Sequence, residues 1–246
     1  MKELKILYLY PDILELYGDY GNIQVLKYRL EKRGYKAIIE KYSIGDKAPD
    51  FKNYDLVFAG GGADQEQSIL AKDLIKYKDN IKEAVNNGVF FLLICGAYQL
   101  FGKYYKGVEG NIIPGLEIFN YYTEAIENRK KRCIGNIVIE ANLNGEKTKI
   151  IGFENHGGQT FDIDTPFGDV LFGNGNKFGD SKEGFFLKNV IATYLHGPLL
   201  SKNPELADYI ISHCLNRKYN EEIKLEPLND DFENLCRKQL LDNFLN

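Results

Sequence analysis

Cys95 is the residue whose surroundings are most typical of a nucleophile. It follows an apolar run that predicts a buried strand and precedes Gly96 and a helical segment, within residues 91–102 (FLLICGAYQLFG). A sharp turn from strand to helix holds one side chain at the edge of a sheet, and the helix start favours a thiolate over a thiol. A small buried hydrophobe is the alternative; Gly96 and the strand-end position favour the nucleophile.

A cysteine nucleophile needs a base, and the chain has three histidines. His213 lies in an amphipathic segment, where a surface or packed histidine is the simpler interpretation. His156 (in FENHGG, residues 153–158) and His196 (in TYLHGP, residues 193–198) each follow a predicted strand. Either imidazole could reach a cysteine at the end of a neighbouring strand. The residue types leave this choice open.

Two glycine-rich stretches are predicted to form turns. Residues 60–67 (GGGADQEQ) lack the GK[ST] ending of a P-loop, so phosphate binding is not indicated. Backbone N–H groups in this turn could instead stabilise an oxyanion beside Cys95, an effect worth roughly 10²–10³ in rate. An ordinary turn between a strand and a helix is the alternative. Residues 173–179 predict a hairpin loop.

The elements that must position these residues alternate between strand and helix in the first half of the chain. Hydrophobic spacing predicts strands at residues 4–10, 37–42, 54–59 and 89–95, and helices at residues 22–33 and 68–87. Such alternation implies parallel βαβ units, hence a doubly wound α/β fold, mostly parallel and flanked by helices. Ligands bind such a sheet at the carboxyl ends of its strands.

The pattern changes after Pro114. Strands are predicted at residues 132–140, 148–154, 169–172 and 190–195, as an antiparallel region that extends the same sheet. Helices return at residues 205–215 and 230–244, and the second is expected to pack on the domain through Phe232, Cys236, Leu240 and Phe244. We expect a single domain over residues 1–246, with a core at about 4–215 and a C-terminal helical segment at 216–246.

Composition excludes several classes of function. The 246 residues include 31 basic and 35 acidic ones, a net charge of -4, which gives no electrostatic motive for binding nucleic acid. No apolar run approaches the roughly 20 residues of a membrane span, and the N-terminus does not resemble a signal peptide. The cysteines lie far apart without a CxxC pair, so neither a zinc site nor a disulfide framework is indicated. We expect a cytoplasmic protein.

Several motifs resemble one family. Residues 94–100 (ICGAYQL) resemble the nucleophile motif of class I glutamine amidotransferases. Residues 193–198 resemble the histidine motif of the cobyric acid synthase branch, which lacks the triad glutamate, and Pro198 stands where that glutamate would be. Together with residues 60–67 and 153–158, the stretch YPDILELYGDYGN (residues 10–22) resembles the GatD-type glutaminase subunits of lipid II isoglutaminyl synthase. The resemblance covers about residues 4–215.

The resemblance implies roles for residues of the site. Cys95 would attack the side-chain amide of L-glutamine and release ammonia. His196 would keep the thiol activated, protonate the ammonia and activate water for deacylation. The backbone N–H groups of Gly62 and Gly96 would bind the oxyanion.

The resemblance also implies binding residues and a partner. Gln99 would help to hold the substrate glutamine. An arginine just before the sequence IGN (residues 134–136) would bind the carboxylate of the substrate. We assign this role to Arg132, and the nearby Arg129 is the alternative. No cofactor is expected in this chain. ATP and metal would belong to a Mur-ligase-like partner (MurT), which would amidate the D-glutamate of lipid II. Alternatives are a glutaminase for corrinoid amidation, a non-catalytic docking subunit and a cysteine peptidase.

Overall fold

The computed structural model describes residues 1–62 and 64–245, and the side chains of Asp64, Gln65 and Arg129 lie outside the description. The strands are β1 (Glu3–Leu9), β2 (Lys36–Tyr42), β3 (Leu56–Ala59), β4 (Phe90–Ile94), β5 (Tyr104–Lys106), β6 (Ile112–Pro114), β7 (Tyr122–Ala125), β8 (Cys133–Leu143), β9 (Glu146–His156), β10 (Gly158–Phe161), β11 (Gly168–Phe172), β12 (Lys182–Glu183), β13 (Phe185–Leu187) and β14 (Val190–Thr193). The α-helices are α1 (Tyr20–Glu31), α2 (Asp64–Leu74), α3 (Lys78–Asn86), α4 (Gly96–Leu100), α5 (Pro204–Tyr219) and α6 (Asp231–Leu245).

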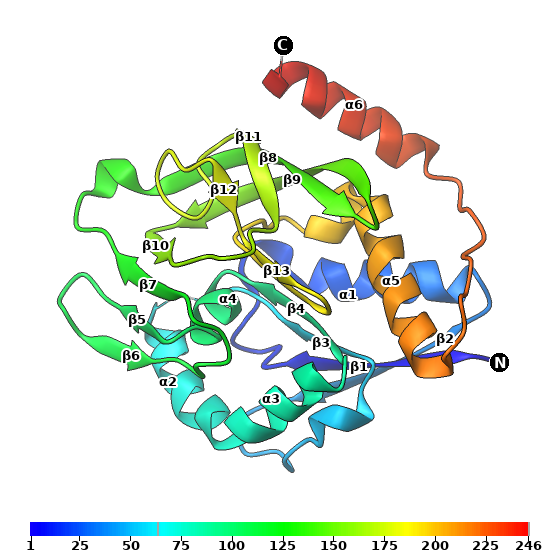
Figure 1. The fold of residues 1–246 in the computed structure, drawn as a ribbon, viewed down its shortest axis with the longest axis horizontal. Helices are drawn as coiled ribbons and strands as arrows, with labels where there is room; N and C mark the ends of the chain where they lie inside the picture. Colours follow the sequence, from blue (N-terminus) through cyan, green and yellow to red (C-terminus); the bar gives the residue numbers. More distant parts are fainter. Residues whose placement is uncertain (63, 246) are drawn as a thin grey trace.

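A mostly parallel sheet forms the centre of the molecule (Figure 1). Its strand order among the described residues is β13-β14-β4-β3-β1-β2, and every pair is parallel except β13 with β14. From β1 the chain forms β2 at one edge of the sheet. It then returns to form β3 and β4 on the other side of β1, so the direction of strand addition reverses. Because βαβ crossovers are right-handed, this reversal places α1 and the α2–α3 pair on opposite faces. The predicted doubly wound α/β fold is therefore confirmed.

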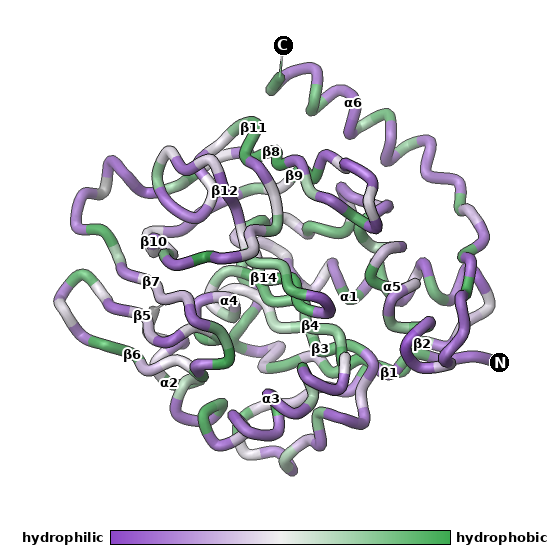
Figure 2. Tube along the Cα trace, viewed as in Figure 1, coloured by the Kyte–Doolittle hydropathy of each residue, from purple (hydrophilic) through white to green (hydrophobic). Residues whose placement is uncertain are grey.

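The central strands are apolar along their whole length. All five residues of β4 (FFLLI) and all four of β3 (LVFA) are buried. Strands covered by helices on both faces have no solvent side, so they read as continuous hydrophobic runs rather than alternating ones. Figure 2 shows this as a band of hydrophobic residues through β3, β4 and β14.

The antiparallel region differs from the sequence-based prediction. Only β13 and β14 join the central sheet, and β14 runs parallel to β4. Among the described residues, the other strands after Pro114 belong to two further sheets, β10-β7-β5-β6 and β12-β11-β8-β9. A strand's own pattern shows which of its faces is buried but does not identify its partner. The stretch 173–179 does connect the antiparallel strands β11 and β12, which confirms the predicted hairpin loop.

Two predicted helices also differ from the structure. The predicted helix at residues 68–87 is divided by a 3-10 turn at Ile75–Tyr77 between α2 and α3. Helix α6 extends away from the body (Figure 1), and its buried residue is Arg237, which pairs with Glu205. Phe232, expected on the packed face, is 75% exposed. The rest of the predicted face does pack: Cys236 and Leu240 are half-buried, and Phe244 stacks on Phe172 of β11 with 5.1 Å between ring centroids.

Candidate active site

Four neighbouring parallel strands end at one edge of the sheet, and each is followed by a residue of the site. His196 follows β14, Cys95 follows β4, Gly61 follows β3 and Asp19 lies in the segment after β1. These strands are adjacent in the order β14-β4-β3-β1. The crevice at the carboxyl ends, beside the point where strand order reverses, is where doubly wound sheets bind ligands.

Cys95 occupies the sharp turn that its sequence predicted. Its backbone has φ 51° and ψ -102°, and its N–H donates to the carbonyl of Thr193 at 2.8 Å. Positive φ is costly for a residue with a side chain and is held here by the surrounding structure. A Cβ at Gly96 would lie 3.0 Å from Gln67 Nε2 and 3.1 Å from the backbone nitrogen of Gly62, so there is little space for a side chain. The turn therefore brings Gly62 and Gly96 together beside the sulfur.

His196 lies against Cys95 and is fully buried. Its Nδ1 donates to the two carboxylate oxygens of Asp19 at 3.2 and 3.1 Å. Its Nε2 has no hydrogen-bond partner among the described residues. A Cβ at Gly61 would lie 2.6 Å from His196 Cε1 and 3.3 Å from Cys95 Cβ, so the ring and the cysteine share that space. Of the two histidines left open by the sequence, the structure brings His196 to the cysteine.

The electrostatics of the pair favour a charged imidazole. Burial lowers the pKa of His196, whereas Cys95 and the hydrogen-bonded Asp19 raise it, and the net result is a pKa of about 10. At neutral pH the ring is therefore an imidazolium facing the sulfur. This arrangement favours a thiolate, which is the reactive form of a cysteine nucleophile.

Asp19 is the residue of this site that sequence reasoning missed. It is fully buried, and besides His196 it accepts the N–H of Gly61 at 2.8 Å. It comes from a segment 177 residues before His196. The resemblance to the cobyric acid synthase branch implied a cysteine–histidine pair without the triad glutamate, and Pro198 stands where that glutamate would be. The available signal was an aspartate in the segment between the first predicted strand and the first predicted helix.

Gln99 is tied to protein groups behind the nucleophile. Its Oε1 accepts from Gln67 Nε2 at 2.8 Å, and its Nε2 donates to the hydroxyl of Tyr194 at 3.1 Å. The same hydroxyl lies 2.6 Å from Thr160 Oγ1. This buried network joins α4 to α2, to β10 and to the residue that follows β14. Gln99 also lines the pocket in front of Cys95.

Cys95 opens into a pocket of about 770 Å³ that also contains Arg132. The exposed Arg132 donates through Nε and Nη2 to Asn155 Oδ1 at 3.2 and 3.0 Å. Asn155 in turn donates to the hydroxyl of Tyr17, whose ring packs edge-on against His196 at 4.9 Å between centroids. A chain of contacts thus joins the guanidinium of Arg132 to the imidazole of His196. Arg129, the alternative, has its side chain outside the described part of the structure.

Glu66 lies in the glycine-rich stretch at residues 60–67. It lines the same pocket, and its Oε2 is buried without a hydrogen-bond partner among the described residues. A carboxylate oxygen in this state is ready to accept a cationic group from a ligand.

His156 and Cys133 lie apart from the Cys95 pair. His156 donates from Nδ1 to the carbonyl of Gly158 at 2.7 Å and stacks on Tyr194, with 3.6 Å between centroids. Burial, and after it the nearby Glu154, raises the pKa of the Cys133 thiol to about 12. Cys133 is therefore a neutral thiol at physiological pH and does not compete with Cys95 as a nucleophile.

Comparison with known proteins shows the family to which this chain is similar. The family model of the CobB/CobQ-like glutamine amidotransferase domain matches residues 5–204. The lipid II isoglutaminyl synthase (glutamine-hydrolyzing) subunit GatD of Staphylococcus aureus is 42% identical over 98% of this chain and 96% of its own length. The subunit of the same name from Streptococcus pneumoniae is 41% identical over 93% and 86%. A probable cobyric acid synthase of Methanococcus vannielii is 31% identical over 65% of this chain but only 32% of its own length.

Solved structures support the fold. The structure of PurLQS from Thermotoga maritima aligns with a TM-score of 0.54 at 18% identity, over 90% of this chain and 100% of that chain. A crystal structure of a glutamine amidotransferase aligns with a TM-score of 0.55 at 16% identity, over 85% and 98%. None of the helices in the described part of the chain is both long and apolar enough to cross a membrane.

Proposed function

Because this chain belongs to the CobB/CobQ-like glutamine amidotransferases, and within them to the GatD-type subunits of lipid II isoglutaminyl synthase, we propose that it hydrolyses L-glutamine and supplies the ammonia for amidation of lipid II. The observation that carries the proposal is the buried row Cys95–His196–Asp19 at the end of a pocket. A cysteine activated by a buried imidazolium suits acyl transfer from an amide.

The first half of the reaction breaks the amide bond. The Cys95 thiolate attacks the side-chain carbonyl carbon of glutamine, and the oxyanion forms near the paired Gly62 and Gly96 backbones. The His196 imidazolium then gives its Nε2 proton to the departing nitrogen. The C–N bond breaks, ammonia leaves, and a γ-glutamyl thioester remains on Cys95.

The second half regenerates the thiolate. His196, now neutral, removes a proton from water at Nε2, and the hydroxide attacks the thioester carbonyl. Glutamate leaves, and the imidazolium and thiolate are restored. Asp19 keeps the proton on Nδ1 throughout, so that Nε2 is always the nitrogen that exchanges protons with the reactants.

Two charged residues of the pocket, Arg132 and Glu66, suit the α-carboxylate and α-ammonium groups of glutamine. We propose that Arg132 binds the α-carboxylate, since a planar guanidinium can do so with two parallel hydrogen bonds. The unpartnered Glu66 Oε2 would accept the α-ammonium. In this arrangement the hydrogen bonds of Gln99 hold the helix that follows Cys95 in position. Gln99 would contact the substrate as part of the pocket wall.

The acceptor of ammonia lies outside this chain. The relatives are named as subunits, and the resemblance implies a Mur-ligase-like partner, MurT, as the synthetase. ATP and metal would be used there to activate the D-glutamate carboxylate of lipid II, yielding D-isoglutamine. The complex would work at the cytoplasmic face of the membrane, where its lipid-linked substrate lies.

Two other functions fit less well. A glutaminase for corrinoid amidation would resemble the cobyric acid synthases, but this chain matches only 32% of the length of one such relative. A non-catalytic docking subunit would not require a cysteine with positive φ beside a buried imidazolium. Nor would it require glycine at position 61, where a Cβ would collide with His196.

Glutamate release from L-glutamine tests the proposal. The purified chain would be assayed alone and with the MurT-like partner, beside C95A and the control C214A. Cys214 is also buried, but it lies on α5, where its thiol donates to the carbonyl of Asp55. We expect release that C95A abolishes and C214A retains. Absence of Cys95-dependent release, even in the complex, would favour the docking subunit.

A further inference from the structure

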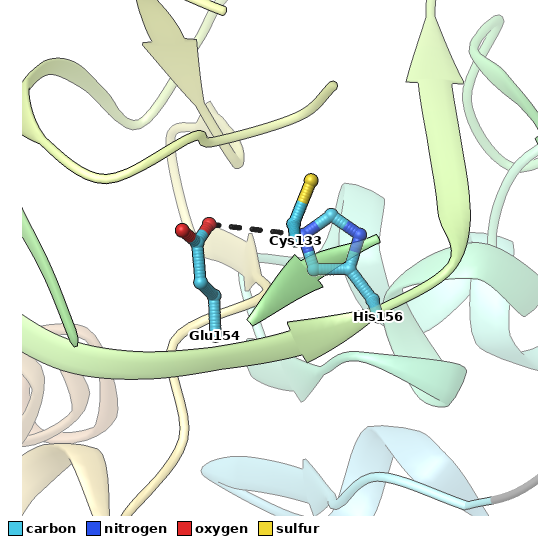
Figure 3. Close-up of side chains that lie close together, drawn as sticks. All are labelled: Cys133, Glu154 and His156. Carbon is cyan, nitrogen blue, oxygen red and sulfur yellow. Dashed lines mark ion pairs between the residues drawn. The ribbon is translucent and has the colours of Figure 1, made fainter. Parts of the chain in front are cut away.

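A second cluster of chemically active side chains lies in the hairpin of β8 and β9. Cys133 pairs directly with His156 across the two strands, and Glu154 lies two residues before His156 on the same face. All three are buried, and their ligand atoms lie within 4.8 Å of one another. Figure 3 shows Glu154 and His156 rising from one strand with Cys133 between them in this view.

His156 has the features of a metal ligand. Donation from Nδ1 to the Gly158 carbonyl at 2.7 Å fixes the tautomer, so the lone pair of Nε2 faces the cluster. Stacking on Tyr194 at 5° between planes fixes the ring orientation. Nε2 itself is buried and has no hydrogen-bond partner among the described residues, and Glu154 Oε2 is 3.9 Å away, too far for a hydrogen bond.

The other two side chains are oriented in the same way. Glu154 Oε1 accepts two N–H groups of Asn174 at 2.8 Å, and Oε2 accepts the N–H of Gly175 at 3.0 Å. Gln159 Nε2 points at the sulfur of Cys133 from 3.8 Å. Outer hydrogen bonds of this kind hold the ligands of protein metal sites in place. A buried ionised carboxylate is usually hydrogen-bonded and either paired with a cation or bound to a metal.

We propose that Cys133 Sγ, Glu154 and His156 Nε2 bind a zinc ion. Thiolate, imidazole and carboxylate together suit Zn²⁺, and the hard cations Mg²⁺ and Ca²⁺ prefer oxygen ligands alone. Ligand atoms on one tetrahedral zinc lie about 3.4–3.6 Å apart, given metal–ligand distances of about 2.0–2.3 Å. Because the ligand atoms lie within 4.8 Å of one another, the ion requires their separations to shorten by up to about 1.2–1.4 Å. It displaces the thiol proton of Cys133 as it binds.

The active-site pocket gives the ion a route of entry, because His156 is part of its wall. A water from the pocket would complete the four ligands. Asn155, between two of the proposed ligands, points to the opposite face of the hairpin and holds Arg132 there. Zinc would thus fix the end of the hairpin that presents the guanidinium to the pocket.

The sequence did not indicate this site. Cys133 is separated from Glu154 by 20 residues and a complete hairpin, so no short motif exists. The ligands meet only because β8 and β9 pair with Cys133 opposite His156.

Metal content and uptake test the proposal. All measurements would use the full chain carrying C95A, so that the catalytic cysteine cannot bind the metal. The variants are C133S and the matched control C214S, since both cysteines are fully buried. We expect about one zinc ion per chain after dialysis against excess Zn²⁺. C133S should weaken binding by at least 10-fold, and C214S should leave it unchanged.

Cobalt substitution gives a readout that does not depend on the stability of a variant. Co²⁺ in the parent chain should give the sulfur-to-cobalt charge-transfer band of a thiolate ligand, and C133S should lack it. Zn²⁺ should raise Tm and excess Mg²⁺ should not. No uptake of either Zn²⁺ or Co²⁺ by the parent chain would overturn the proposal. An equal cobalt spectrum in C133S would also overturn it.

Discussion

The buried carboxylate of Asp19 is expected to set the protonation of the catalytic histidine. Its two oxygens lie 3.2 and 3.1 Å from His196 Nδ1, and both side chains are fully buried. A hydrogen bond to a charged group contributes about 1.5–3 kcal/mol, and one pKa unit corresponds to about 1.4 kcal/mol. Asp19→Asn keeps one acceptor oxygen but removes the charge. The pKa of His196, now about 10, should therefore fall by roughly one to two units.

The same energy should appear in catalysis. A loss of about 1.5–3 kcal/mol corresponds to a decrease of about 10- to 100-fold in kcat/KM for glutamine. D19A should lose more, because it also removes the acceptor of the Gly61 N–H. KM should change little in D19N, since Asp19 does not line the substrate pocket.

NMR titration of the imidazoles is the direct assay. The chain has three histidines, so His156 and His213 serve as internal references and H196Q assigns the third signal. D55N is the matched control, because Asp55 is also buried and accepts a backbone N–H, that of Lys5 at 2.7 Å. An unchanged His196 pKa in D19N, with kcat/KM within twofold of the wild type, would refute the reasoning.

Three further predictions concern other parts of the site and its support. G61A should fold but lose at least 100-fold in kcat, because the added Cβ would lie 2.6 Å from His196 Cε1; circular dichroism and steady-state rates check this, and a fully active variant would contradict it. R132A should raise KM for glutamine by about 10- to 100-fold with a smaller change in kcat, whereas an unchanged KM would move the carboxylate site elsewhere. Burial raises the pKa of Glu183 from 4.5 to about 8, so the stability from its retained proton is full below pH 4.5 and is lost as pH rises through 8. E183Q should flatten the fall in urea midpoint between pH 5 and 8, and a slope equal to that of the wild type would show that Glu183 does not cause it.

Local patterns were sufficient to predict the parallel core and the nucleophile. The residues around Cys95 specify a buried strand, a turn and a helix within a dozen positions, and the structure has the expected sharp turn there. The same holds for α1, whose apolar spacing is local. In each case the information lies in neighbouring residues.

Contacts between distant segments could not be predicted in the same way. Asp19 meets His196 only because β1, β3, β4 and β14 are adjacent and parallel, and strand order is not written in any one strand. The separate sheet of β8 and β9 was missed for the same reason. The choice between His156 and His196 likewise depended on which strand neighbours β4.

The covalent intermediate tests the central claim most directly. The purified chain, with its MurT-like partner, would be mixed with L-glutamine, quenched in acid within milliseconds to seconds, digested and analysed by mass spectrometry. We predict a γ-glutamyl adduct on the peptide that contains Cys95, lost after treatment with hydroxylamine and absent from C95A. Glutamate release without any adduct on Cys95, or with undiminished rate in C95A, would contradict the account.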